Sequence, residues 1–308
     1  MALRIDCHND TVGFFNDHPS LERLPQAHLD YQRLRAYLDA AFFAIFVDQK
    51  EYAGREAPRF SSVLDKLRAD LAGQPDFQLL LGRDQLEKPQ PQRHLVLVSM
   101  EGAAPLGQEA EHLTDYYGRG LRAVGLTWNY DTAYAGAAAA GGGGLTPAGQ
   151  RLVARCNRLG VLLDAAHGSS QTLADLLKYS KAPIIDSHTV CGALGENRWG
   201  RCLSDEELRA LAAQGGVAGL AFVPDFLGGD GGLDRLCEHI EHAVALVGSA
   251  HVALGADFDG TEMHPAYAGV QHLPKLYQRL QQRGMSCGDI DNVAGESVRR
   301  LLLQVLPA

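Results

Sequence analysis

The sequence predicts an α/β fold, a (β/α)₈ TIM barrel with an extra helical insert after the second strand. Eight short apolar segments recur along the 308 residues, and amphipathic stretches with helical spacing lie between most of them. The segments are apolar throughout, which is typical of parallel strands covered on both faces. A doubly wound parallel sheet would give the same alternation of elements, but ligand-type residues at the segment ends favour the barrel.

The expected elements follow one another as repeated strand–helix units. Between the last strands, the stretch from Ser204 to Gly215 shows a Ser cap, acidic residues in its first turn and a closing Gly, all typical of a helix. The interval from Asp48 to Gln92 is polar and is expected to hold the helical insert. We expect one metal-dependent hydrolase domain over residues 1–308. The expected strands are Leu3–His8, Ala40–Val47, His94–Met100, Ala123–Trp128, Val161–Ala166, Pro183–Ser187, Val217–Val223 and Val252–Ala256.

A low-complexity tract of Ala and Gly runs from Ala135 to Pro147, directly after the fourth expected strand. Its composition predicts a flexible loop over the mouth of the barrel, too mobile to pack.

Composition and charge exclude several classes of function. The chain has 28 Lys and Arg against 37 Asp and Glu, a formal charge of −9, and no basic stripe, so nucleic acid is a poor candidate partner. No signal peptide is recognisable, and no segment approaches the ~20 apolar residues of a membrane helix, which predicts a cytoplasmic protein without membrane contact. The six cysteines show no CxxC pair, which argues against a zinc knuckle and predicts mostly buried thiols.

Ligand-type residues stand where five of the apolar segments end. In a (β/α)₈ barrel these ends meet at one mouth, so the side chains are expected to converge there. Any one of them has an ordinary structural reading as a hydrogen-bonded His or a turn-forming acid, but five in one register are hard to attribute to chance. They are His8, Asp10, Glu101, His167, His188 and Asp257.

The donor set predicts a binuclear metal site. Imidazole and carboxylate ligands without thiolate suit divalent ions such as Zn²⁺, and five ligands exceed what one catalytic zinc needs. Two divalent ions, most simply Zn²⁺, can share Glu101, with His8 and Asp10 on one ion and His167 and His188 on the other. A hydroxide between two cations is a nucleophile at neutral pH, which predicts hydrolysis. Asp257, which is not needed as a ligand, is expected to carry the proton from the attacking water to the leaving group.

These segments together resemble the membrane (renal) dipeptidase family, peptidase family M19 of the amidohydrolase superfamily. The resemblance covers nearly the whole chain, and the order and spacing of its motifs carry it. It implies a (β/α)₈ barrel, a binuclear zinc site and the hydrolysis of dipeptides, often with a D-residue at the C-terminal position, and it points to a homodimer. The motifs are His8–Asp10, Met100–Gly102, Leu126–Asn129, Leu145–Gly149, Asn157–Val161, Asp164–Ser169, Ser187–His188 and Asp257–Gly260.

The same resemblance assigns substrate-binding residues and shows where this chain departs from the family. Arg201 falls where the family places an Arg that binds the substrate, and its guanidinium suits a terminal carboxylate. The preceding loop is about two residues longer than usual, which makes Arg198 a rival for that role. Trp128 stands in place of a family His thought to contact the scissile carbonyl, and indole cannot titrate, so Asn129 or Tyr130 is an alternative donor.

Two other functions remain open at this point. Because Trp128 departs from the family pattern, a hydrolase of N-acyl amino acids, or of another small amide or lactone, is an alternative function. A metal-binding barrel without catalysis is the non-enzymatic alternative, although the complete ligand set and Asp257 argue against it. A second His pair, His239 and His242, lies in a charged stretch that predicts a solvated helix face and not a metal site.

Overall fold

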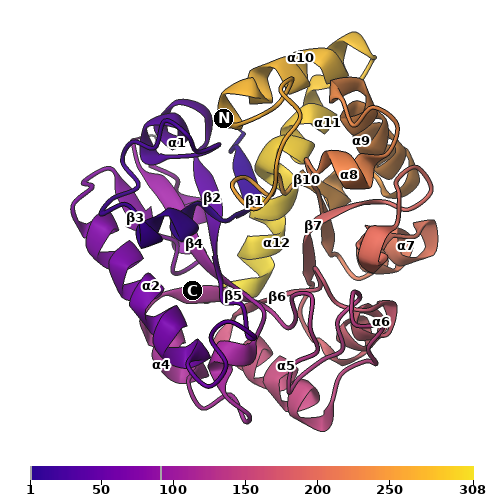
Figure 1. The fold of residues 1–308 in the computed structure, drawn as a ribbon. Helices are drawn as coiled ribbons and strands as arrows, with labels where there is room; N and C mark the ends of the chain where they lie inside the picture. The colour runs from indigo at the N-terminus through magenta and orange to yellow at the C-terminus, as the bar shows by residue number, and fades with distance from the viewer. Residues whose placement is uncertain (1, 91) are drawn as a thin grey trace.

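The computed structural model describes residues 2–90 and 92–308, and a closed barrel of eight parallel strands forms its centre (Figure 1). The strands follow one another around the barrel in the order β1, β2, β4, β5, β6, β7, β9 and β10, and pairing between β10 and β1 closes it. All eight expected strands are present, so the barrel is confirmed. Their bounds are β1 Ile5–Asn9, β2 Ala40–Phe46, β4 His94–Glu101, β5 Leu121–Gly125, β6 Leu162–Asp164, β7 Ile185–Cys191, β9 Val217–Leu220 and β10 Val252–Leu254.

The helices surround the barrel as the alternation of elements predicts. Helix α7 shows how local sequence sets a boundary: Ser204 caps it, and the side chain of Glu207 accepts a hydrogen bond from the Ser204 N–H in a capping box. The helices are α1 Tyr31–Tyr37, α2 Glu56–Ala72, α3 Asp84–Glu87, α4 Leu113–Gly118, α5 Pro147–Leu159, α6 Ser170–Tyr179, α7 Asp205–Ala213, α8 Pro224–Leu227, α9 Leu233–Val247, α10 Leu273–Gln282, α11 Cys287–Asp291 and α12 Ser297–Val305.

The insert after β2 contains more than helices. Helices α2 and α3 lie in it as expected, but so does a short strand, β3 (Phe77–Leu79), which pairs with the first residues of β4. A second short strand, β8 (Cys202–Leu203), pairs with the end of β7 and so ties the segment that follows Arg201 to the barrel.

The apolar core has two parts, and they leave one end of the barrel open for a site. The larger part lies between the strands and the surrounding helices. The smaller part joins residues near the start of the strands, such as Ile5, Leu95 and Val217, to Val298 and Leu302 of α12. Helix α12 therefore covers the N-terminal end of the barrel, and the C-terminal ends of the strands form the mouth.

The Ala and Gly tract after β5 is packed, which corrects the expectation of a mobile loop. Ala135 and Leu145 form an antiparallel bridge, and Ala137 bridges to Gly168 next to His167. A Cβ on Gly136 would overlap the backbone of Gly143, so glycine serves here for close approach of two chain segments and not for mobility.

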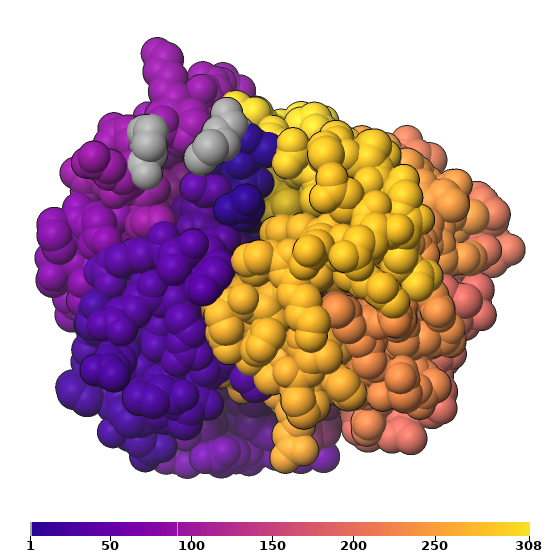
Figure 2. Space-filling model, turned by 90° about the horizontal axis from the view of Figure 1, so that it is seen from above, coloured from indigo at the N-terminus to yellow at the C-terminus, as the bar shows by residue number. Residues whose placement is uncertain are grey.

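The N-terminal segment contacts the segment that leads into α12. Figure 2 shows the first and last segments, indigo and yellow, in contact on one face, and the Leu3 N–H donates to the Glu296 carboxylate at 2.9 Å. Of the helices within residues 2–90 and 92–308, none is both long enough and apolar enough to cross a membrane.

Candidate metal centre

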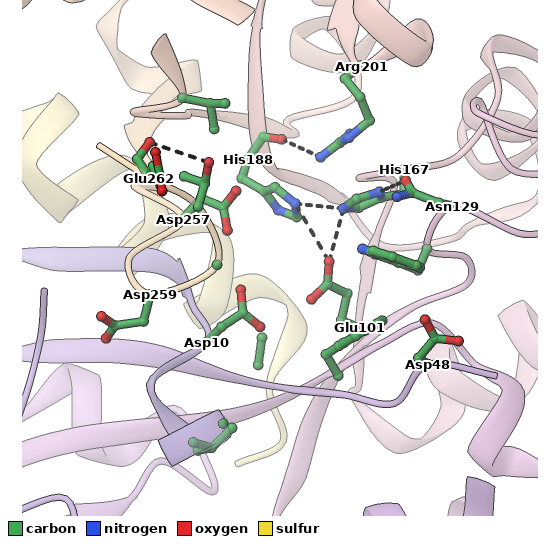
Figure 3. A pocket seen from close by; sticks show the side chains of 18 of the residues that line it. Asp10, Asp48, Glu101, Asn129, His167, His188, Arg201, Asp257, Asp259 and Glu262 are labelled. Carbon is green, nitrogen blue, oxygen red and sulfur yellow. Dashed lines mark hydrogen bonds and ion pairs between the residues drawn. The ribbon is translucent and has the colours of Figure 1, made fainter. Parts of the chain in front are cut away.

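Glu101, the last residue of β4, stands between the predicted ligands at the barrel mouth (Figure 3). Its Oε2 lies 3.5 Å from Nε2 of His8, and its Oε1 lies 2.9 Å from Nε2 of His167 and 3.9 Å from Nε2 of His188. On the far side of His8, the Asp10 Oδ2 lies 3.5 Å from the same Nε2. The two carboxylate oxygens of Glu101 thus face two separate groups of ligand atoms.

The Nε2 atoms of the three histidines point into the cluster. The Nε2 of His8 is buried, and no hydrogen bond to it is found in the part of the chain that the structure describes. The Nε2 atoms of His167 and His188 face each other at 3.0 Å. Ligand atoms within 4.8 Å of one another form two groups: His8 with Glu101 and His188, and His8 with Asp10 and Asp257. This donor set fits divalent cations.

The chain holds these groups in unusual backbone conformations. Non-glycine residues with positive φ include His167 (64°), Asp257 (62°) and Asp259 (69°), a conformation that costs about 1–3 kcal/mol each and clusters at functional sites. Hydrogen bonds fix the loop that carries two of them: Asp257 N–H donates to the His8 carbonyl at 3.1 Å, and Thr11 Oγ1 donates to Asp259 at 2.6 Å.

Burial and neighbouring charges shift the pKa values of the groups in this cluster. Burial acts to lower the pKa of His8, but the charges of Glu101 and Asp10 outweigh it and raise that pKa. Burial acts to raise the pKa of Glu101, but His8 and His167 hold it below its usual range. Burial raises the pKa of Asp257 against the opposing charge of His8.

The two remaining imidazoles are held neutral. Burial, assisted by the positive charge of Arg201, lowers the pKa of His167 to about 4. Burial also places the pKa of His188 well below its usual range. Because an imidazole must be deprotonated to bind a metal, both rings are in the form that a metal ligand needs.

Hydrogen bonds from neighbouring side chains orient these rings. The Nδ1 of His167 lies 3.1 Å from Oδ1 of Asn129, and the Nδ1 of His188 lies 2.8 Å from Oγ of Ser187. Such contacts fix the ring that presents its other nitrogen to a metal. Sequence reasoning assigned no role to Ser187 and placed Asn129 at the substrate, although a polar residue next to a candidate ligand is a usable signal.

Gly260 is a further residue that sequence reasoning missed. A Cβ at this position would overlap the carboxylate oxygens of both Asp10 and Asp257. Only the absence of a side chain lets the two carboxylates approach His8 from the same side.

Comparison with known proteins agrees with this geometry. The family model for membrane dipeptidase, peptidase family M19, matches residues 2–306. The chain belongs to this family. The expected resemblance to this family is therefore confirmed.

Individual relatives cover nearly the whole chain. A metallopeptidase from Rhodobacter sphaeroides, solved with a phosphinate mimic of the dipeptide L-Ala-D-Ala, is 25% identical with a TM-score of 0.88 and covers 98% of this chain and 99% of its own. The dipeptidase AC of family M19 is 26% identical with a TM-score of 0.90, and both chains are covered in full. Dipeptidase aclJ from Aspergillus oryzae is 29% identical over 94% of this chain and 71% of its own length.

Arg201 and Arg198, the two candidates for binding the substrate carboxylate, lie in different environments. Arg201 is 5% exposed, lines the cavity at the mouth and donates from one terminal nitrogen to the His188 carbonyl at 3.0 Å, while its buried Nε has no partner among the described residues. Arg198 is largely exposed and forms an ion pair with Asp225 at 2.9 Å. Of the two, Arg201 is the one that lines the same cavity as Glu101, His167 and His188.

Trp128 also lines the cavity, which has a volume of about 880 Å³. Its ring packs against Phe46 at a centroid distance of 4.5 Å, and its centroid lies 6.2 Å from that of His167. Trp128 is therefore part of an aromatic wall of the cavity.

The prediction that His239 and His242 lie on a solvated helix face is wrong for His239 and only partly right for His242. His239 is fully buried between α9 and the barrel, where its Nδ1 accepts a hydrogen bond from the Cys191 N–H at 3.1 Å. His242 is half-buried and contacts Asp205 at 2.8 Å. Neither ring belongs to a metal-ligand group in the described part of the chain.

Proposed function

We propose that this protein is a metal-dependent dipeptidase that holds two divalent ions, most simply Zn²⁺, around Glu101. The convergence of His8, His167 and His188 on the two oxygens of Glu101, with Asp10 against His8, in a chain of family M19, is the observation that carries the proposal. Divalent ions bound there would supply activation of water at neutral pH and polarisation of the scissile carbonyl.

Three side chains of the site have separate roles in this proposal. Asp257, grouped with His8 and Asp10, moves the proton from the attacking water to the leaving amine. Arg201 binds the terminal carboxylate of the dipeptide. Two observations support this role: its buried Nε has no partner among the described residues, and one of its terminal nitrogens is held by the His188 carbonyl. Asn129 orients His167 through the contact between their side chains. We assign Asn129 this role in place of direct substrate binding.

The stereochemistry of the substrate is part of the same proposal. The Rhodobacter sphaeroides relative was solved with a mimic of L-Ala-D-Ala, and its chain covers 98% of this one. We therefore propose that a D-residue is accepted at the C-terminal position.

The test compares substrates and one variant on protein loaded with Zn²⁺. Metal content is measured by mass spectrometry, and hydrolysis is measured for L,L and L,D dipeptides beside N-acyl amino acids and lactones. The proposal predicts two equivalents of metal, turnover of dipeptides, and a loss of about 10²–10⁴-fold in kcat for Asp257→Asn with its metal content unchanged. Turnover of only the acylated compounds, well under two equivalents of metal, or full activity of Asp257→Asn would refute it.

A further inference from the structure

The barrel topology places Arg201 and Phe46 on opposite sides of the mouth. Phe46 ends β2, and Arg201 leads into β8, which pairs with β7. Three strands lie between β2 and β7 in either direction around the eight-stranded barrel, so these two strands stand across from each other. In Figure 3, Arg201 lies above Glu101, whereas Asp48, which follows β2, lies to its lower right.

The side of the mouth across from Arg201 is built mainly from aromatic and aliphatic surface. Phe46 pairs in register with Glu101, so its side chain stands next to the metal centre. Trp128 follows β5 on the other side of β4, and its ring packs against Phe46 at 4.5 Å with an interplanar angle of 49°. Ala44, two residues before Phe46 on the same face of β2, and Val63 of α2 are buried and form apolar backing for this part of the cavity.

Charges on this side are balanced and do not select a charged ligand. Asp48 and Glu51 line the cavity here, but Lys50 lies over the Tyr130 ring at 3.9 Å, and Arg59 lies over the Tyr52 ring at 5.1 Å. Of these four charged residues, Asp48, Glu51 and Arg59 line the cavity near the aromatic wall formed by Phe46 and Trp128. Both aromatic side chains are half-buried and line the cavity, where a ligand would cover more of their apolar area.

From this arrangement we propose that Phe46 and Trp128 receive the side chain of the substrate's N-terminal residue and select large apolar or aromatic residues there. The inference rests on the proposed dipeptidase function and on Arg201 as the carboxylate anchor. A dipeptide held by its carboxylate at Arg201, with its peptide bond at Glu101, extends its N-terminal residue toward β2 and β5. The first side chain then lies against the aromatic wall, and a Gly or Ala there leaves the wall uncovered.

The test measures kcat/KM for two series of dipeptides on protein loaded with Zn²⁺. In the first series the N-terminal residue is Gly, Ala, Leu or Phe before a constant Ala, and in the second these residues follow a constant Ala. The natural protein is expected to prefer Phe-Ala over Gly-Ala by at least about tenfold, the size of effect that apolar pockets give. Trp128→Ala is expected to bring this ratio close to one by lowering Phe-Ala turnover more than Gly-Ala turnover, and to keep the order of preference within the second series.

Two further variants keep the test decisive. Trp128→Leu retains apolar volume if the alanine variant folds poorly, and it is expected to shift the preference from Phe toward Leu. Trp199→Ala removes an exposed Trp from the Arg201 side of the same mouth and is expected to leave the Phe-Ala to Gly-Ala ratio as it was.

Each contrary outcome has a distinct meaning. Equal turnover of Gly-Ala and Phe-Ala by the natural protein, an equal loss for all substrates in Trp128→Ala, or a change confined to the second series overturns the inference while dipeptide hydrolysis stands. A metal-loaded protein that hydrolyses no dipeptide refutes the proposed function, and this inference with it.

Discussion

The Oδ1 of Asn129 lies 3.1 Å from the Nδ1 of His167, so an amide four residues beyond β5 sets the orientation of an imidazole that follows β6. Because the amide oxygen can only accept, the contact assigns the proton of His167 to Nδ1 and leaves Nε2 with its lone pair toward Glu101. The ring is thereby fixed in the tautomer that a metal ligand requires.

Removal of this contact is expected to weaken metal binding without unfolding the protein. Asn129→Ala should lower the affinity for one of two divalent ions about 10–100-fold, the usual effect of losing a group that orients a ligand. Competition with a chromophoric chelator measures it. Asn129→Asp, which keeps an acceptor at the same place, is the matched control and should retain most of the affinity, and equal losses in both variants would contradict the orienting role.

Gly260 provides a second test of the geometry around His8. In Gly260→Ala the new Cβ would overlap the carboxylates of Asp10 and Asp257, so both must move away from His8. Displacement of catalytic groups by about 1 Å costs on the order of 100-fold in rate, and we expect a loss of that size in kcat/KM for dipeptides. Metal content should fall from two equivalents toward one, because the His167 and His188 side is untouched.

The control for Gly260→Ala is Gly118→Ala. Gly118 lies in α4, and a Cβ added there would meet no neighbouring atom within 4 Å, so this variant should match the natural protein in activity and metal content. Thermal unfolding of both variants separates a local effect from misfolding. An active Gly260→Ala protein with two metals would show that the mouth can relax around the added methyl group.

Arg201 and Arg198 can be distinguished by kinetics. Arg201→Ala is expected to lower kcat/KM for dipeptides about 100-fold or more, since it removes a buried cation from its proposed carboxylate partner. Arg198→Ala, which removes an exposed ion pair with Asp225, should change kcat/KM less than about fivefold.

Dipeptide amides, which lack the carboxylate, identify the cause of the Arg201 effect. If Arg201 binds the carboxylate, Arg201→Ala should discriminate little between a dipeptide and its amide, whereas the natural protein should prefer the dipeptide strongly. An unchanged preference in Arg201→Ala would assign the loss to its hydrogen bond with the His188 carbonyl and not to the substrate.

The sequence predicted the strands and the convergence of the candidate ligands at one mouth because both depend on local pattern. Uninterrupted apolar runs mark buried parallel strands, and the end of each run fixes where a ligand such as Glu101 must lie. It did not find what depends on contacts between distant segments. The glycines near Gly136 read as flexibility by composition, but they permit close backbone approach to Gly143. His239 read as solvated because charged residues surround it in sequence, but α9 turns it toward Cys191 of β7.

Burial of His239 predicts a pH-dependent stability. Burial lowers its pKa to about 4, from an ordinary value of 6.5 in the unfolded chain. Below pH 6.5 the unfolded chain binds a proton that the folded protein does not, so the contribution is complete above pH 6.5 and is lost as the pH falls toward 4. A difference of about 2.5 pKa units corresponds to ~3 kcal/mol in the free energy of unfolding.

Urea unfolding of the natural protein and of His239→Gln between pH 4.5 and 7.5 measures this contribution. The variant offers an acceptor for the Cys191 N–H and a donor for the Leu227 carbonyl but does not titrate, so its stability should fall less steeply as the pH is lowered. Loss of metal in acid affects both proteins alike, so the difference between their slopes isolates His239. His112→Gln, at an exposed His, should match the natural slope. Parallel pH profiles for the natural protein and His239→Gln would show that the buried imidazole is protonated in the fold.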